Sequence, residues 1–127
     1  MSYYFAKKLD APFSEAVDRA VAALKARGFG VLTKIDVQST LKEKIGVDFR
    51  PYVILGACNP KMAHEALKAE DKIGTMLPCN VIVQEVDGGT EVAAVDPVAS
   101  MQAIQNASLA SIAEKVRGEL KAAVEAI

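Results

Sequence analysis

The sequence has few of the residues that carry most catalytic and metal chemistry. It contains two cysteines, one histidine and no tryptophan in 127 residues. A Cys-x-x-Cys pair and a second histidine are both missing, which excludes the standard zinc motifs and the thioredoxin-type redox motif. The glycines occur singly or as Gly88-Gly89, which excludes a phosphate-binding loop. We therefore find no catalytic signature and expect a protein that is not an enzyme.

The sequence also lacks an excess of charge of either sign. Fifteen basic and sixteen acidic residues give a formal net charge of −1. Nucleic-acid-binding proteins usually carry a basic excess or a basic stripe, so we expect no nucleic-acid partner.

Long apolar runs are missing as well. The longest, Tyr52 to Cys58, is far shorter than the roughly 20 residues that a membrane helix needs. The N-terminus has no basic region followed by an apolar stretch, so it does not resemble a signal peptide. We expect a cytoplasmic protein with no membrane partner, in which both cysteines stay reduced.

What the sequence does have is a composition suited to one buried core. Hydrophobic residues make up 51% of the chain and charged residues 24%, which is far from a disordered composition. With 127 residues, we expect a single domain over residues 1–127.

The hydrophobic pattern predicts strands alternating with helices. Strict alternation over 30–37 indicates a half-buried strand, and Asp87-Gly88-Gly89 indicates a hairpin. Residues 71–78 are expected to form a loop or an irregular turn, and the C-terminal helical sequence is expected to break near Asn106. The expected strands are 3–8, 30–37, 51–58, 81–86 and 90–95, and the expected helices are 12–27, 38–45, 60–70 and 96 to the end. This β-α-β-(short α)-β-α-β-β-α order predicts an α+β fold, a two-layer sandwich.

Several residues mark where the helices begin and end. Gly28 is a natural C-terminal stop for the first long helix. Asn59 is a good N-cap with Pro60 as the first helical residue. Ser39 or Thr40 is expected to cap the short helix.

Two cysteine-asparagine steps are the strongest chemical feature. Cys58-Asn59 precedes a helix that carries His64, and Cys79-Asn80 runs into a strand. A helix N-terminus lowers the pKa of a nearby thiol, which is the local environment of a reactive cysteine at Cys58. The alternative is that Cys58 ends a buried strand and packs as a small hydrophobe.

Whether these residues form one site depends on topology. Cys79 can lie beside Cys58 if its strand returns antiparallel, and it lies at the other end of the sheet if the strands are parallel. Together, Cys58, Cys79 and His64 could give three ligands to a soft metal, or the two thiols could form a redox pair. His64 is equally explained as a surface histidine that points away from Cys58.

Two weaker groups of residues remain. Asp48, Arg50 and Tyr52 could hold a polar ligand, although a solvated strand entrance also explains them. Three methionines are better explained as packing residues than as copper ligands: Met62, Met76 and Met101.

Several segments together resemble the bacterial and archaeal family of domain of unknown function 302. They are Arg27 to Val37, Leu41 to Phe49, Tyr52 to Pro60, Ala63-His64 and Leu77 to Val81. The resemblance implies a TATA-binding-protein-like fold, with a curved, largely antiparallel sheet backed by helices, and it implies a homodimer. It implies no activity, and a fold name alone carries no claim of DNA binding.

These observations leave three hypotheses. The first is a domain that binds a small ligand or a protein partner as a homodimer, with the cofactor, if any, unknown. The second is a thiol-centred site at Cys58 and Cys79. The third is a hydrolase or transferase, which requires a deep pocket with convergent polar groups.

Overall fold

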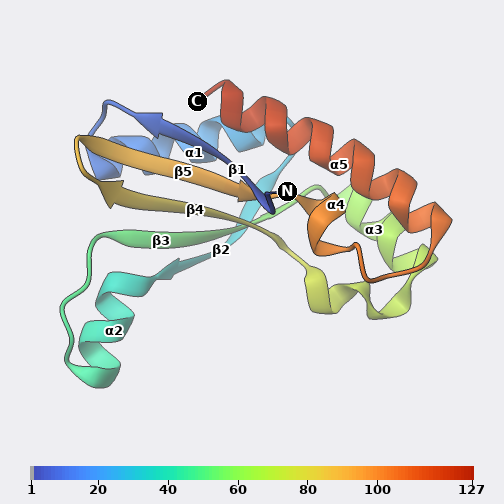
Figure 1. The fold of residues 1–127 in the computed structure, drawn as a ribbon, viewed down its shortest axis with the longest axis horizontal. Helices are drawn as coiled ribbons and strands as arrows, with labels where there is room; N and C mark the ends of the chain where they lie inside the picture. Colours follow the sequence, from blue (N-terminus) through green and yellow to red (C-terminus); the bar gives the residue numbers. More distant parts are fainter. Residues whose placement is uncertain (1) are drawn as a thin grey trace.

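A computed structural model describes residues 2–127 as a five-stranded sheet with helices against one face and one end (Figure 1). The elements are β1 (Tyr4–Leu9), α1 (Phe13–Ala26), β2 (Gly30–Asp36), α2 (Val37–Ile45), β3 (Tyr52–Cys58), α3 (Pro60–Ala69), η1 (Asp71–Met76), β4 (Cys79–Val86), β5 (Gly89–Val95), α4 (Pro97–Ser100) and α5 (Ala107–Glu125). The predicted α+β class and the order of the main elements are confirmed.

The strand order in the sheet is β1-β5-β4-β3-β2, and every neighbouring pair is antiparallel. The sheet therefore begins and ends with strands from the first third of the chain. β1 and β2 are the edges, and β4 lies in the middle. Three of the four pairings join strands that are consecutive in the sequence, whereas β1 closes onto β5 near the other end of the chain.

The core lies between one face of the sheet and the helices α1 and α5. Alternate residues of the three inner strands point to this face and are fully or almost fully buried: Val53, Leu55, Val81, Val83, Val92 and Ala94. Leu24 of α1 and Leu120 of α5 pack against them. Each of these two helices therefore buries one apolar side against the sheet.

The predicted helix boundaries are mostly confirmed by their caps. Gly28 has φ 85°, the left-handed conformation expected after a helix end. Asn59 caps α3, and Pro60 is its first residue. The expected break near Asn106 is confirmed, because Asn106 caps a separate α5. The predicted cap of the short helix is wrong: Asp36, not Ser39 or Thr40, accepts the capping bond from the backbone N–H of Ser39.

β2 is the element that departs most from prediction. A shift in register between Val31 and Thr33 leaves Leu32 as an extra residue, so the two ends of β2 alternate out of phase. Leu32 is 67% exposed and Ile35 is 49% exposed. The expected half-buried strand is therefore an exposed edge strand. The segment 71–78 also differs, because residues Asp71–Met76 form a 3-10 helix rather than a plain loop.

Within residues 2–127, the helices α1 and α5 leave the other face of the sheet uncovered. In the registers that join the five strands, one apolar row crosses this face without interruption: Ile35, Ile54, Ile82, Ala93 and Ala6. We call the surface around this row the open face.

Candidate functional site

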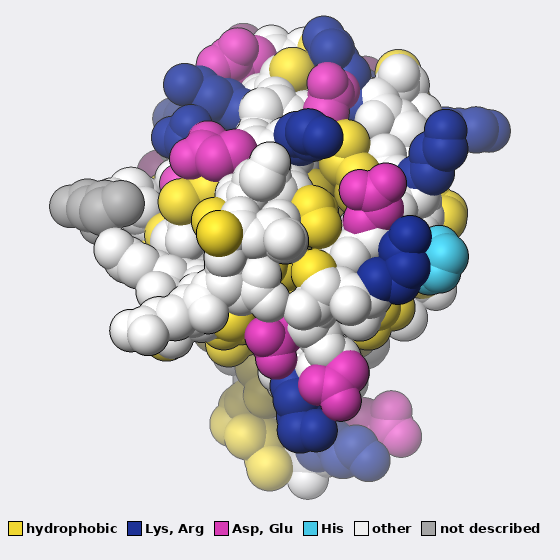
Figure 2. Space-filling model, turned by 90° about the vertical axis from the view of Figure 1, so that its right-hand side faces the viewer, with side chains coloured by type: hydrophobic (Ala, Val, Ile, Leu, Met, Phe, Trp, Pro, Cys, Tyr) yellow, Lys and Arg dark blue, Asp and Glu magenta, His cyan; other side chains and the backbone are white. Residues whose placement is uncertain are grey.

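An apolar cleft lies at the end of the sheet where β3 stops and β4 starts. Its volume is about 330 Å³, and α3, η1, α4 and α5 close around it. The side chains that line it include Met62, Ala63, Leu77, Met101, Leu109 and Ile112. Figure 2 views this end of the molecule and shows hydrophobic side chains between the charged groups. This cleft is the candidate functional site.

The lining of the cleft carries no charge among the residues that the structure describes. Its one amide side chain is Asn59, and Asn59 Oδ1 is already occupied because it accepts a hydrogen bond of 3.2 Å from the backbone N–H of Met62. The remaining lining is hydrocarbon, thioether and thiol. The cleft is therefore suited to bind apolar groups and has no acid or base suited to catalysis.

The places where the helices begin and end explain why the cleft exists. Asn59 and Pro60 start α3 directly after β3, so α3 leaves the end of the sheet. The short α4 and the break before Asn106 let the chain pass over this end before α5 returns along the helical face. A small buried cluster of Ala66, Ile73 and Leu109 joins α3, η1 and α5.

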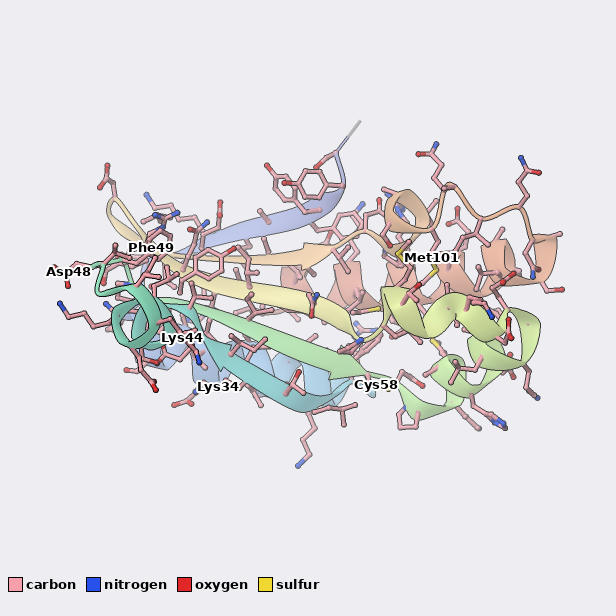
Figure 3. The ribbon with its side chains drawn as sticks, turned by 90° about the horizontal axis from the view of Figure 1, so that it is seen from below. Lys34, Lys44, Asp48, Phe49, Cys58 and Met101 are labelled. Carbon is pink, nitrogen blue, oxygen red and sulfur yellow. The ribbon has the colours of Figure 1, made fainter. Side chains whose placement is uncertain are left out.

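Both cysteines contribute to the cleft lining, and both are free thiols. The antiparallel return of β4 is confirmed: Cys79 pairs with Ala57, and Cys58 pairs with Gly30 of β2. Successive side chains of a strand point to opposite faces, so the register does not make Cys58 and Cys79 a cross-strand pair. Figure 3 shows Cys58 at the end of the sheet where α3 begins, on the same side as Met101.

The buried thiol of Cys79 resists deprotonation. Burial, with a smaller contribution from Cys58, raises the pKa of Cys79 from 9.0 to about 11. A thiol with this pKa stays protonated at neutral pH, and the protonated form is neither a nucleophile nor a metal ligand. Burial therefore disfavours the thiolate form of Cys79 near neutral pH.

The predicted three-ligand metal site is not assembled. Within residues 2–127, no group of three or more His, Cys, Asp or Glu side chains is arranged to hold a metal ion. His64 is exposed on α3 and is not part of the cleft lining, as expected for a surface histidine. His64 therefore does not contribute to the cleft that Cys58 and Cys79 line, because its side chain is exposed on α3.

The weaker candidates are distributed over other parts of the molecule. Asp48 forms an exposed ion pair with Lys42 at 3.0 Å, at the far end of the sheet beside α2 (Figure 3). Arg50 donates to Gln84, and Asn80 lies exposed on the open face.

The methionines divide by position. Met62 and Met101 line the cleft, whereas Met76 lies outside its lining and is 42% exposed. The sequence analysis missed the cleft, although one signal was present. The apolar stripe of α3 continues to Leu67, which remains 44% exposed and faces the cleft rather than the core.

Comparison with known proteins places the chain in a family. The sequence matches the family described as "Domain of unknown function DUF302" over residues 5–127. The chain therefore belongs to this family, as the resemblance indicated. Curated proteins give no match.

A solved structure supports the same assignment. It is titled "Crystal structure of uncharacterized conserved protein DUF302 from Bacillus stearothermophilus". The two chains are 30% identical, the alignment covers 99% of this chain and 98% of the other, and the TM-score is 0.93. Within residues 2–127, no helix is both long and apolar enough to cross a lipid bilayer.

Proposed function

We propose that this protein is a binding module that holds a small, uncharged, apolar ligand in the cleft beside α3. The observation that supports the proposal is a cleft of about 330 Å³ whose lining is apolar and carries no charged residue among those described. Small-molecule sites are typically apolar concavities of about 300–1,000 Å³, so this cleft falls at the lower end of that range.

The lining restricts the chemistry of the ligand. A carboxylate or ammonium inside the cleft would lose its hydration without gaining a partner of opposite charge, which is strongly unfavourable. At about 30 Å³ for each water-sized group, the volume accommodates roughly ten non-hydrogen atoms. A short hydrocarbon chain or a single substituted ring fits these limits. Met62 and Met101 adapt easily to different shapes, which suits a site of this kind.

A titration with two probes of equal length tests the proposal. We expect isothermal titration calorimetry to detect saturable binding of 1-octanol and at least tenfold weaker binding of octanoate. Ala63→Trp places an indole in the cleft and should weaken 1-octanol binding at least tenfold. Ala110→Trp is the matched control, because Ala110 is exposed on α5 and does not line the cleft.

Two results would count against the proposal. One is equal binding of both probes, and the other is unchanged 1-octanol affinity in Ala63→Trp with an unchanged melting temperature. Circular dichroism of each variant separates a blocked cleft from a damaged fold.

We further infer that the protein works as a homodimer joined through β2 and α2. Four of the large exposed hydrophobic side chains lie between residues 32 and 47: Leu32, Ile35, Ile45 and Val47. β2 is an edge strand with unpaired backbone groups along one side, and α2 has no buried residue. Exposed apolar edges are rarely left uncovered in stable proteins.

A second copy of the chain is the partner that this edge suits best. A two-fold axis beside β2 lets the same strand of two copies pair antiparallel, so each copy supplies the same surface. In such a pair the apolar side chains at positions 45 and 47, which follow the C-terminal end of β2, lie toward the N-terminal end of the partner's strand, where Leu32 is exposed. This arrangement would place the dimer contact beside one wall of the cleft, because Leu32 of β2 also lines the cleft.

A further inference from the structure

The geometry points to a second binding site, on the open face of the sheet, that takes a small aromatic ammonium ion. This site shares no lining residue with the cleft. It is a groove of about 410 Å³ whose floor is formed by β5 and β4. It therefore does not depend on the function proposed above.

All three tyrosines of the chain line this groove. Tyr3 and Tyr4 come from the start of the chain, and Tyr52 comes from β3. β1 and β3 are not neighbours: β5 and β4 lie between them, so their backbones are about 14 Å apart at three strand spacings. Tyr3 and Tyr4 pack edge to face, with ring centroids 5.0 Å apart. Tyr4 pairs with Val95 and Tyr52 pairs with Gln84, so the aromatic rings stand at diagonal corners of the surface that β5 and β4 form.

The hollow between the rings lies where the apolar row changes from isoleucine to alanine. Ile54, Ile82 and Ala93 follow one another across β3, β4 and β5 in the apolar row of the open face. Ala93 is the shortest of the three, so the floor drops at β5. An aromatic ring can lie on this apolar floor with its edges toward the tyrosines.

One charged residue lines the groove, within the part of the chain described: Glu91. Its Oε1 accepts a hydrogen bond of 2.9 Å from Gln84 Nε2, and Gln84 Oε1 accepts one of 2.9 Å from Arg50 Nε. Arg50 itself lies against aromatic rings, 4.4 Å from the Phe49 centroid. Gln84 is therefore held from both sides and orients the carboxylate of Glu91.

The second carboxylate oxygen of Glu91 is open to a ligand. No ion pair involving Glu91 occurs among residues 2–127. Lys8 is its cross-strand neighbour, but the Lys8 ammonium extends to the hairpin and lies 3.1 Å from the Cβ position of Gly88. A half-buried carboxylate in a groove lined by tyrosine side chains favours a cation, because both the charge and the ring quadrupoles attract it. The Arg50 guanidinium already lies over the Tyr52 ring, 5.9 Å from its centroid, so the Tyr3 and Tyr4 rings are the ones left to a ligand cation.

Tyrosine fluorescence reports on this site directly, since the chain has no tryptophan and each tyrosine lines the groove. Three probes of similar shape separate the contribution of the ligand's charge from that of its aromatic ring: benzylammonium, benzyl alcohol and benzoate. We expect a saturable fluorescence change with benzylammonium, about tenfold weaker binding of benzyl alcohol, and no saturable change with benzoate. Ala93→Leu fills the floor and should abolish the response.

Glu91→Gln is the decisive variant because it keeps the size of the side chain and the bond to Gln84. It should lower benzylammonium affinity about tenfold, to the level of benzyl alcohol. Glu85→Gln is the matched control, since Glu85 is exposed on the same hairpin and does not line the groove. Equal affinities of the three probes for the wild type, or equal losses in the two variants at equal melting temperature, would overturn the proposal.

The remaining competitor for this face is a second copy of the chain. Acrylamide quenching of tyrosine fluorescence, measured over a range of protein concentrations, distinguishes a groove open to ligands from a groove covered by a partner chain. The proposal predicts quenching that does not change while the sedimentation mass doubles. Loss of quenching in step with dimer formation would mean that a partner chain covers the groove, and it would overturn the site.

Discussion

The side-chain Oδ1 of Asn59 accepts a hydrogen bond of 3.2 Å from the backbone N–H of Met62. This bond fixes the first turn of α3, and Met62 lines the cleft. The first of the two Cys-Asn steps therefore has a structural role: its asparagine positions one wall of the candidate site.

Replacing Asn59 tests this role. Asn59→Ala removes the N-cap and should lower the free energy of unfolding by about 1 kcal/mol in urea titrations. The second Cys-Asn step provides the control, because Asn80 is exposed and caps no helix. Asn80→Ala should change stability by less than about 0.5 kcal/mol. Equal effects of the two substitutions would show that the cap contributes nothing.

Gly28 offers a second test of local geometry. Its φ of 85° is unfavourable for any side chain, and an added Cβ would lie 3.1 Å from Asn59 Nδ2. Gly28→Ala should therefore destabilise the protein by about 1 kcal/mol or more. At Gly30 a Cβ would meet no atom within 4 Å, so Gly30→Ala should leave stability unchanged or raise it slightly. Thermal unfolding of both variants checks the contrast, and a harmless Gly28→Ala would refute it.

The raised pKa of Cys79 predicts a loss of stability in alkali. The folded thiol keeps its proton up to a pKa of about 11, whereas the ordinary value is 9.0. Between these values the folded state binds more protons than the unfolded state, so stability falls as pH rises through this window, by up to about 2–3 kcal/mol. Cys79→Ala should remove this pH-dependent loss of stability when the free energy of unfolding in urea is compared at pH 8 and pH 11. An identical pH dependence in wild type and variant would contradict the predicted pKa.

The dimer inference predicts a change in mass from one exposed substitution. The chain has a mass of 13.5 kDa, so a homodimer should sediment at about twice this value. Ile45 is 66% exposed on α2, and Ile45→Asp should shift the protein toward the monomer with little loss of stability. Thr40→Asp adds the same charge at another exposed position of α2 and should leave the dimer intact. A wild-type monomer at high concentration would exclude the dimer.

Local sequence patterns predicted much of the fold for a clear physical reason. Asn59, Gly28 and the Asp87-Gly88 turn act through neighbouring backbone groups, so their effects appear in the sequence itself. The amphipathic stripes of α1 and α5 likewise report their own burial. The element order and most boundaries follow from these local rules.

The features that the sequence could not supply depend on contacts between distant segments. The bulge at Leu32 reverses the phase of β2 and exposes a strand whose alternation predicts partial burial. The groove forms because β1 pairs with β5, which brings Tyr4 and Tyr52 to opposite sides of one surface. Likewise, His64 is separated from the two thiols by the direction in which α3 leaves the sheet. No local pattern encodes these relationships.

The binding of an apolar ligand in the cleft is the central claim, and methionine methyl NMR tests it most directly. Met62 and Met101 line the cleft, whereas Met76 is exposed outside its lining and serves as an internal reference. With ¹³C-methyl methionine and added 1-octanol, the account predicts saturable shifts of the Met62 and Met101 methyl signals and an unchanged Met76 signal. Unshifted Met62 and Met101 signals, or equal shifts of all three, would contradict it.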